Sequence, residues 1–311
     1  MTKRLFIALV LLMAAPVLVL AQQPQNSLTV TVKGVSFKMI RVQGGTFTMG
    51  CTSEQGGECS SNEKPAHKVT LSTYYIGETE VTQELWKAVM GSNPSEFAPK
   101  ETNSARCSYD AFVADINKLN AKKPGSMRVP TRQEWDAAMV TTSGSLKCPV
   151  ENVSWNDCQT FIRKLNELTG KKFRLPTEAE WEFAARGGTK SAGYKYSGSN
   201  DINAVAWYTV NAYDKGKSSP DYGTHVVKTK KPNELGIYDM SGNVYEWCSD
   251  WDRYYNSSAQ TNPAGPSSGS YRVLRGGHWG DDARYCRSSR RDSSGPDYRS
   301  NSLGLRLVVL P

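Results

Sequence analysis

Alternation of apolar and polar residues marks the N-terminal third of the chain as strand-forming. Leu28, Val30 and Val32 alternate with polar residues, which is the pattern of a half-buried strand. The same reasoning predicts further strands within 35–49, on both sides of a glycine turn, and at 67–71 and 74–76.

Helical periodicity replaces the alternation after these strands. Thr82 is a predicted N-cap, Leu85 and Val89 share one helical face, and Gly91 ends the helix. We therefore expect an amphipathic helix over residues 82–91.

A longer helical stretch is repeated in the sequence. Residues 112–138 match residues 158–184, so that Arg128 and Arg174 lie 46 positions apart. Each copy predicts a helix, a turn and a second helix that opens with Pro-Thr-x-x-Glu-Trp, where Thr caps the helix and Glu completes a capping box. Two copies are too few for a solenoid, so we expect a partly duplicated insertion at about 98–147 within one domain.

The second half of the chain reads mostly as loops. The whole chain has 311 residues, 38% hydrophobic and 22% charged, which suffice for a buried core in one large domain or two small ones. Eight Trp and fifteen Tyr among many Gly and Ser favour a loop-rich α+β fold over a helical bundle. Regular structure is predicted at 236–240, 243–247, 272–275 and 303–309.

The first residues predict a targeting segment. Lys3 and Arg4 precede an apolar run from Leu5 to Leu20 that ends at Ala21, as in a secretory signal peptide. A membrane anchor is the alternative, but about 16 apolar residues fall short of the roughly 20 that a span requires. We expect a cleaved signal at 1–21, a linker and first strand at 22–37, and the domain at 38–311. The mature protein is then secreted or periplasmic, at the cell envelope, with no later membrane span.

The charge distribution and the cysteines indicate which partners and which cellular compartment suit the protein. The net charge is +8, but the basic residues are scattered, and nucleic-acid binding would require a basic stripe with a reading element. Of the seven cysteines, Cys51 and Cys59 flank Gly56-Gly57 and could close a short loop in an oxidising compartment. The odd number leaves at least one thiol free or paired between molecules, and the other pairings stay open.

Four motifs follow one another from residue 77 to residue 306. The first is Gly-x-x-Glu-Val-Thr at 77–82, and the second runs from Val-Ser-Trp at 153–155 to Arg-Leu-Pro-Thr-Glu-Ala-Glu-Trp-Glu at 174–182. The third is Asn-Glu-Leu-Gly-Ile-Tyr-Asp-Met-Ser-Gly-Asn-Val-x-Glu-Trp at 233–247, and the fourth runs from Arg-Gly-Gly at 275–277 to Gly-x-Arg at 304–306. In this order they resemble the sulfatase-modifying-factor family, over about residues 38–309. The resemblance implies a single domain with the irregular α+β fold of formylglycine-generating enzymes, related to C-type lectins.

The resemblance also implies an oxidase chemistry. Enzymes of this family oxidise a sulfatase cysteine, in a Cys-x-Pro-x-Arg motif, to formylglycine with molecular oxygen and a copper ion held by two thiolates. Soft Cu(I) prefers thiolate ligands. Counted from Gly276-Gly277, the second active cysteine falls on Cys286, the first on Asp281, and His278 replaces a small hydroxyl residue. A carboxylate is a poor ligand for Cu(I), so we expect a pseudoenzyme that lacks the full cysteine pair.

The residue types also allow two other metal sites. His278, Asp281 and Cys286 are residue types that zinc accepts, but a fourth ligand is missing, and a surface histidine with a structural cysteine is the simpler interpretation. Calcium is the firmer expectation, because residues 243–246 resemble a calcium loop of the family. The resemblance assigns its oxygen ligands to Asn243, Val244 and Glu246, and the alternative is an Asn-capped turn with Glu246 in a salt bridge.

The stretch after the glycine pair has the composition of a binding surface. Between Gly280 and Ser302, Ala283 is the single aliphatic residue, and Lys, Glu, Gln, Met and Trp are absent. Tyr gives contact area at low entropic cost, and Ser, Gly and Asn adapt to a ligand. The stretch resembles the C-terminal variable regions of retroelement-diversified lectin-fold proteins. The predicted binding face comprises Trp279, Asp282, Tyr285, Arg287, Arg290, Asp292 and Tyr298.

Three functions remain open from the sequence. The first is a secreted, calcium-stabilised, non-catalytic protein that binds a protein or glycan through this face. The second is a copper-dependent formylglycine-generating oxidase acting on a sulfatase polypeptide. The third is a structural subunit of a cell-envelope machine. Asp281 at the position of the expected cysteine favours the first and third over the second.

Overall fold

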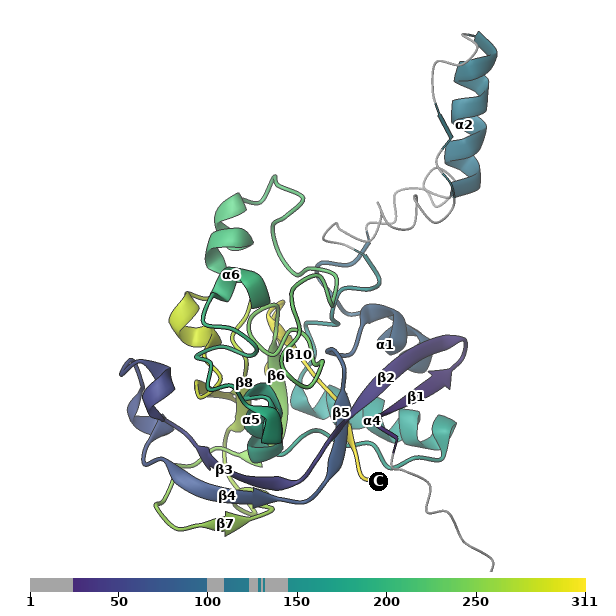
Figure 1. The fold of residues 1–311 in the computed structure, drawn as a ribbon. Helices are drawn as coiled ribbons and strands as arrows, with labels where there is room; N and C mark the ends of the chain where they lie inside the picture. The colour runs from purple at the N-terminus through teal and green to yellow at the C-terminus, as the bar shows by residue number, and fades with distance from the viewer. Residues whose placement is uncertain (1–24, 100–108, 123–127, 130, 132–144) are drawn as a thin grey trace, which may run out of the picture.

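Three small sheets and a few short helices make up the fold (Figure 1). The computed structural model describes residues 25–99, 109–122, 128–129, 131 and 145–311. The helices are α1 (Gln83–Met90), α2 (Tyr109–Lys122), α4 (Trp155–Thr169), α5 (Glu178–Ala185) and α6 (Ile202–Val205). The short 3-10 turns are η1 (Ser53–Gln55), η2 (Ser61–Glu63), η3 (Gly188–Lys190), η4 (Thr209–Asn211), η5 (Tyr213–Lys215) and η6 (Ala283–Cys286).

The first sheet joins the two ends of the domain. Its order is β1 (Ser27–Val32), β2 (Val35–Val42), β5 (Tyr74–Gly77) and β11 (Val308–Val309), all antiparallel. β1 pairs with β2 along its whole length, from Ser27 with Ile40 to Val32 with Val35. The predicted first strand is therefore an integral part of the domain, which begins before residue 38.

The other two sheets are formed by strands from distant parts of the chain. One has the order β10 (Leu303–Gly304), β6 (Tyr245–Trp251), β8 (Arg272–Arg275) and β9 (Arg291–Ser294), with β10 parallel to β6. The other has β3 (Gly45–Met49), β4 (His67–Leu71) and β7 (Gln260–Thr261), with β7 parallel to β4.

Apolar side chains from the helices fill the space between the sheets. Trp86 of α1 stacks on Phe161 of α4, with ring centroids 4.8 Å apart and planes 4° from parallel. Trp181 of α5 is fully buried in a second cluster that also contains Val273 of β8. The loop-rich α+β fold that the sequence predicts is confirmed.

Helix caps are where the sequence predicted best. The Thr82 Oγ1 accepts a hydrogen bond from the Leu85 N–H at 3.2 Å, and Gly91 ends α1 in the left-handed conformation. Thr177 and Glu180 form the predicted capping box of α5. In contrast, residues 236–240 form no strand; Asn233 Oδ1 accepts hydrogen bonds from Leu235 and Ile237 N–H groups and folds this segment into a turn.

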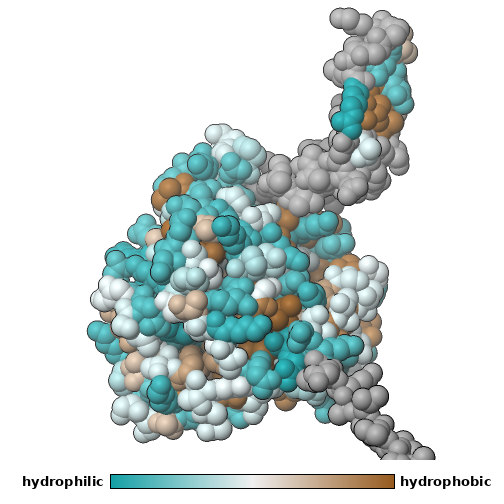
Figure 2. Space-filling view, viewed as in Figure 1, coloured by the Kyte–Doolittle hydropathy of each residue, from teal (hydrophilic) through white to brown (hydrophobic). Residues whose placement is uncertain are grey.

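Part of the predicted organisation falls on residues outside the described ranges. The signal at 1–21 lies there, and so does most of the insertion at 98–147. Within that insertion, α2 covers the predicted first-copy helix and stands apart from the other elements (Figure 1). Among the described residues, no helix is both long and apolar enough to cross a membrane. The surface seen in Figure 2 is mainly hydrophilic, with hydrophobic residues in small scattered patches.

Candidate functional site

Two glycines after β8 bring the chain back onto Cys286. Gly276 and Gly277 have φ angles of 102° and 73°, which favour glycine. A Cβ on Gly277 would lie 2.8 Å from the Cys286 Sγ and 2.9 Å from the Tyr285 carbonyl oxygen. Glycine at 277 is therefore required for this close approach, and it fixes the loop that carries the predicted active-site residues.

Cys286 lies inside the protein rather than on its surface. Its side chain is fully buried and packs in a small cluster with Tyr196, Val205 and Tyr208. Burial raises the pKa of the Cys286 thiol well above its usual range, and the nearby carboxylates of Asp281 and Asp282 raise this pKa further. The thiolate is the nucleophile and the metal ligand, so this environment keeps the sulfur in its unreactive form.

Asp281 is engaged with His278 and with the backbone of another loop. The His278 Nδ1 accepts a hydrogen bond from the Gly280 N–H at 3.0 Å, so the neutral ring carries its proton on Nε2. That Nε2 lies 3.3 Å from the Asp281 Oδ1. The Asp281 carbonyl oxygen accepts a hydrogen bond from the Thr209 N–H at 3.0 Å.

These residues do not fit a copper ion. In the family that the sequence resembles, Cu(I) is held by two thiolates, and here the pair is reduced to one buried thiol and a carboxylate beside a histidine. Within the described part of the chain, no group of three or more His, Cys, Asp and Glu side chains is placed to hold a metal ion.

The donors predicted for calcium do not fit that ion well either. Both Glu246 oxygens accept hydrogen bonds from Arg306, and Oε2 also accepts one from the Trp181 indole N–H. The Asn243 Oδ1 accepts from the His225 N–H, and the Asn243 carbonyl oxygen accepts from the Trp279 N–H. A cation would have to displace these partners. The salt bridge with Glu246, the alternative from the sequence, is what the geometry supports, and Val244 is fully buried beside it.

Trp279 was expected on the binding face, but its side chain is only 4% exposed. Its indole N–H donates to the Asn301 carbonyl oxygen at 3.1 Å, and its rings contact Phe97, Tyr213 and Tyr222 at centroid distances of 5.2, 5.8 and 5.0 Å. Large aromatic rings gain most from burial, so Trp279 supports the face from beneath.

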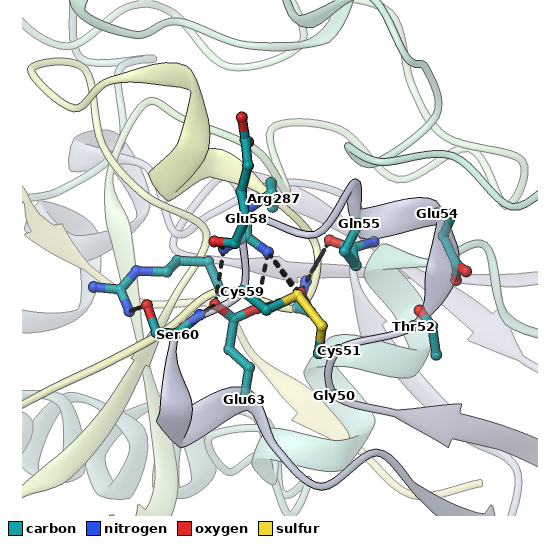
Figure 3. Close-up of a disulfide and its surroundings, with 12 residues drawn as sticks. Gly50, Cys51, Thr52, Glu54, Gln55, Glu58, Cys59, Ser60, Glu63 and Arg287 are labelled. Atoms are coloured by element: carbon teal, nitrogen blue, oxygen red, sulfur yellow. Dashed lines mark hydrogen bonds and ion pairs between the residues drawn. A yellow bond between two sulfur atoms is a disulfide. The ribbon is translucent and has the colours of Figure 1, made fainter.

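Arg287 was also expected on the face and is buried instead, with 1% exposure. Both of its terminal nitrogens donate to the Glu63 carboxylate at 2.8 Å, and one donates to the Glu58 carbonyl oxygen at 3.2 Å (Figure 3). A buried guanidinium requires such pairing. Arg290 is partly buried, and it donates to the Ser60 Oγ at 3.2 Å.

The loop that holds Arg287 is closed by a disulfide between Cys51 and Cys59 (Figure 3). The predicted local pairing is thus present. Among the described residues, Cys158, Cys248 and Cys286 carry free thiols and are buried. Cys148 is buried as well.

The remaining predicted face residues do point to solvent. The side chains of Asp282 and Asp292 are 64% and 44% exposed, Tyr298 is 55% exposed as a residue, and Tyr285 is partly exposed. Between them the buried residues Cys286 and Arg287 anchor the loop. The stretch 278–302, with loops on both sides of β9, is therefore anchored and presents polar and aromatic side chains.

Comparison with known proteins agrees with the motifs and the fold. The sequence profile described as the sulfatase-modifying factor enzyme 1-like domain matches residues 27–310. The chain belongs to this family. The match begins at the start of β1, as the pairing of β1 with β2 requires.

Relatives of the chain in this family include both enzymes and proteins with other names. The formylglycine-generating enzyme of Streptomyces coelicolor is 34% identical over 283 residues, which span 86% of this chain and 87% of that enzyme. The chaperone protein LppX of Paenibacillus barcinonensis is 37% identical over 256 residues, 79% of each chain. The solved structure of Treponema denticola variable protein 1 has a TM-score of 0.67 and 34% identity, and it covers 92% of this chain and 99% of its own.

Proposed function

We propose that the chain is an exported, non-catalytic member of this family that binds a protein or glycan through the loop face of residues 278–302. Export rests on the signal segment predicted at residues 1–21. Calcium has no part in the proposal, because Glu246 is already neutralised by Arg306.

The environment of Cys286 carries the non-catalytic part of the proposal. Copper chemistry in the family needs two thiolates, and Asp281 occupies the position of the first. The second is a fully buried thiol whose pKa is raised well above its usual range by burial and by the nearby Asp281 and Asp282. A protonated, enclosed thiol is neither a good ligand nor a good nucleophile.

The arrangement of exposed side chains supports the binding part. Asp282, Tyr285, Asp292 and Tyr298 reach solvent from β9 and the loops beside it, which buried ion pairs hold in place. Rigid support combined with adaptable polar and aromatic contacts is typical of binding loops. One similar structure is of a protein named as variable, which fits a face that can change while its anchors stay.

Titration with Cu(I) against a colorimetric chelator tests the loss of the active centre. We expect the native protein and Cys286→Ser to compete equally poorly for copper. Asp281→Cys, which restores the cysteine pair, is the variant that could gain a site. Uptake of one equivalent of Cu(I) by the native protein, lost in Cys286→Ser, would contradict the proposal.

A further inference from the structure

A cluster of aromatic side chains ties two distant segments to the start of the loop face. Trp279 contacts Phe97, Tyr213 and Tyr222, and Tyr213 and Tyr222 also contact each other, with centroids 5.8 Å apart. Trp279 is buried, Phe97 and Tyr222 are partly buried, and Tyr213 is half exposed. The turn that contains Tyr213 is therefore attached to the face rather than merely near it.

Hydrogen bonds fix the same turn to the loop. The Thr209 N–H donates to the Asp281 carbonyl oxygen at 3.0 Å, and the Thr209 Oγ1 donates to the Gly280 carbonyl oxygen at 2.6 Å. A Cβ built on Gly280 would lie 3.6 Å from the Tyr213 ring. The turn η4–η5 and residues 278–282 thus form one continuous surface.

This turn exposes large apolar side chains that nothing in the described structure covers. Val210 is 55% exposed and Tyr213 is 50% exposed, within a surface that is otherwise mainly polar. Val210 and Tyr213 are exposed, whereas the Trp279 ring that Tyr213 contacts is buried. The turn is bonded to Gly280 and Asp281, so it presents an aliphatic and an aromatic side chain next to the exposed Asp282. Protein interfaces likewise combine apolar and polar groups.

We infer that the binding face extends onto the η4–η5 turn, and that Val210 and Tyr213 form its apolar anchor for a polypeptide partner. This inference rests on the proposed function and selects the class of ligand. A sugar gains from stacking on an aromatic ring and from hydrogen bonds to its hydroxyls, but little from an aliphatic Val. An apolar side chain of a protein partner gains from both Val210 and Tyr213.

Panning a random-peptide phage library on the native mature protein supplies defined probes for the test. Dissociation constants of the enriched synthetic peptides are then measured for Val210→Asp, Tyr213→Ser, Asp282→Lys and two controls. The controls are Leu168→Asp and Tyr254→Ser, because these residues are 47% and 75% exposed on α4 and in the segment after β6. Val210→Asp changes an exposed side chain and so keeps the test valid if Tyr213→Ser unfolds.

We expect Val210→Asp and Tyr213→Ser to weaken binding about tenfold or more, the loss typical of a truncated anchor. The two controls should stay within about twofold. Peptides that depend on Asp282 but not on Val210 would overturn the extended face and leave the proposed function standing. Peptides whose binding is unchanged by all three substitutions would contradict both the extended face and the proposed function. Failure to enrich any peptide would overturn the polypeptide class.

Discussion

The arginines of the C-terminal stretch fall into a buried group and an exposed group. Arg287, Arg291 and Arg306 are each at most 1% exposed, and their guanidinium groups bind Glu63, Glu178 and Glu246. The side chain of Arg284 is 61% exposed. Sequence reasoning placed Arg287 among the ligand-facing residues because composition alone does not distinguish a buried, paired arginine from an exposed one.

Cys286 should resist alkylation in the native protein. Its full burial and raised pKa, caused first by burial, leave little thiolate for attack at neutral pH. We expect iodoacetamide at pH 7 to leave Cys286 unlabelled by mass spectrometry, and to label it after denaturation. Rapid labelling of the folded protein would show that the thiol is accessible and reactive.

Arg306→Met should destabilise the protein strongly. Arg306 binds both oxygens of Glu246 and also donates to the Gly77 and Tyr238 carbonyl oxygens. Removal of one partner leaves a buried charge unpaired, which costs about 3–5 kcal/mol. Urea unfolding measures the loss.

The double variant Glu246→Gln with Arg306→Met is the control for that experiment. It removes both charges, so it should recover part of the lost free energy of unfolding. If the double variant is as unstable as the sum of the single variants, Glu246 and Arg306 are not a coupled pair.

At the scale of elements, the sequence predicted what local chemistry determines. Caps such as Thr82 and Thr177, and the alternating strands of the N-terminal third, occur where expected. The strand β9 (Arg291–Ser294) was missed because it has no apolar alternation. It is a strand because it pairs with β8 and because Arg291 binds Glu178 at the start of α5. Such contacts between distant segments leave no signal in a single sequence.

The disulfide-closed loop should contribute measurably to stability. Cys51 and Cys59 are eight positions apart, and closing so short a loop restricts the unfolded chain by about 2–3 kcal/mol. The same loop presents the Glu58 carbonyl oxygen to Arg287, and Glu63 follows it. We expect Cys51→Ser with Cys59→Ser to lose about this free energy in urea unfolding. An unchanged midpoint and slope would contradict the structural role of the loop.

At the scale of the whole molecule, the C-terminal strands complete two of the sheets. β11 pairs with β5, β10 pairs with β6, and Arg306 lies between them with its charge buried. The core therefore contains many ionised groups as well as apolar side chains.

The sequence established the family and the position of Asp281, because four motifs in one order are specific. It could not show which face residues are buried, because that depends on contacts across the whole chain.

Stability should respond to pH through buried Glu151. Burial raises the pKa of Glu151 from 4.5 to about 7, and its Oε1 accepts the Phe97 N–H at 2.9 Å. The folded state then holds this proton more tightly than the unfolded state between these two values. The contribution of Glu151 to stability is fully present below pH 4.5 and is lost as pH rises towards 7.

Glu151→Gln removes this titration and keeps an acceptor for Phe97. We expect the variant to gain stability relative to the native protein as pH rises from 4.5 to 7, in urea unfolding at several pH values. The exposed Glu84→Gln serves as the control. Parallel curves for the native protein and Glu151→Gln would contradict the raised pKa.

The central claim is that this member of the family does not carry out its oxidase chemistry. The direct measurement mixes the mature protein, copper and a reductant with a peptide that contains Cys-x-Pro-x-Arg, and follows the peptide cysteine by mass spectrometry. We predict no formylglycine beside an active formylglycine-generating enzyme run in parallel. Conversion by the native protein that disappears in Cys286→Ser would contradict the account and place Cys286 at a working active centre.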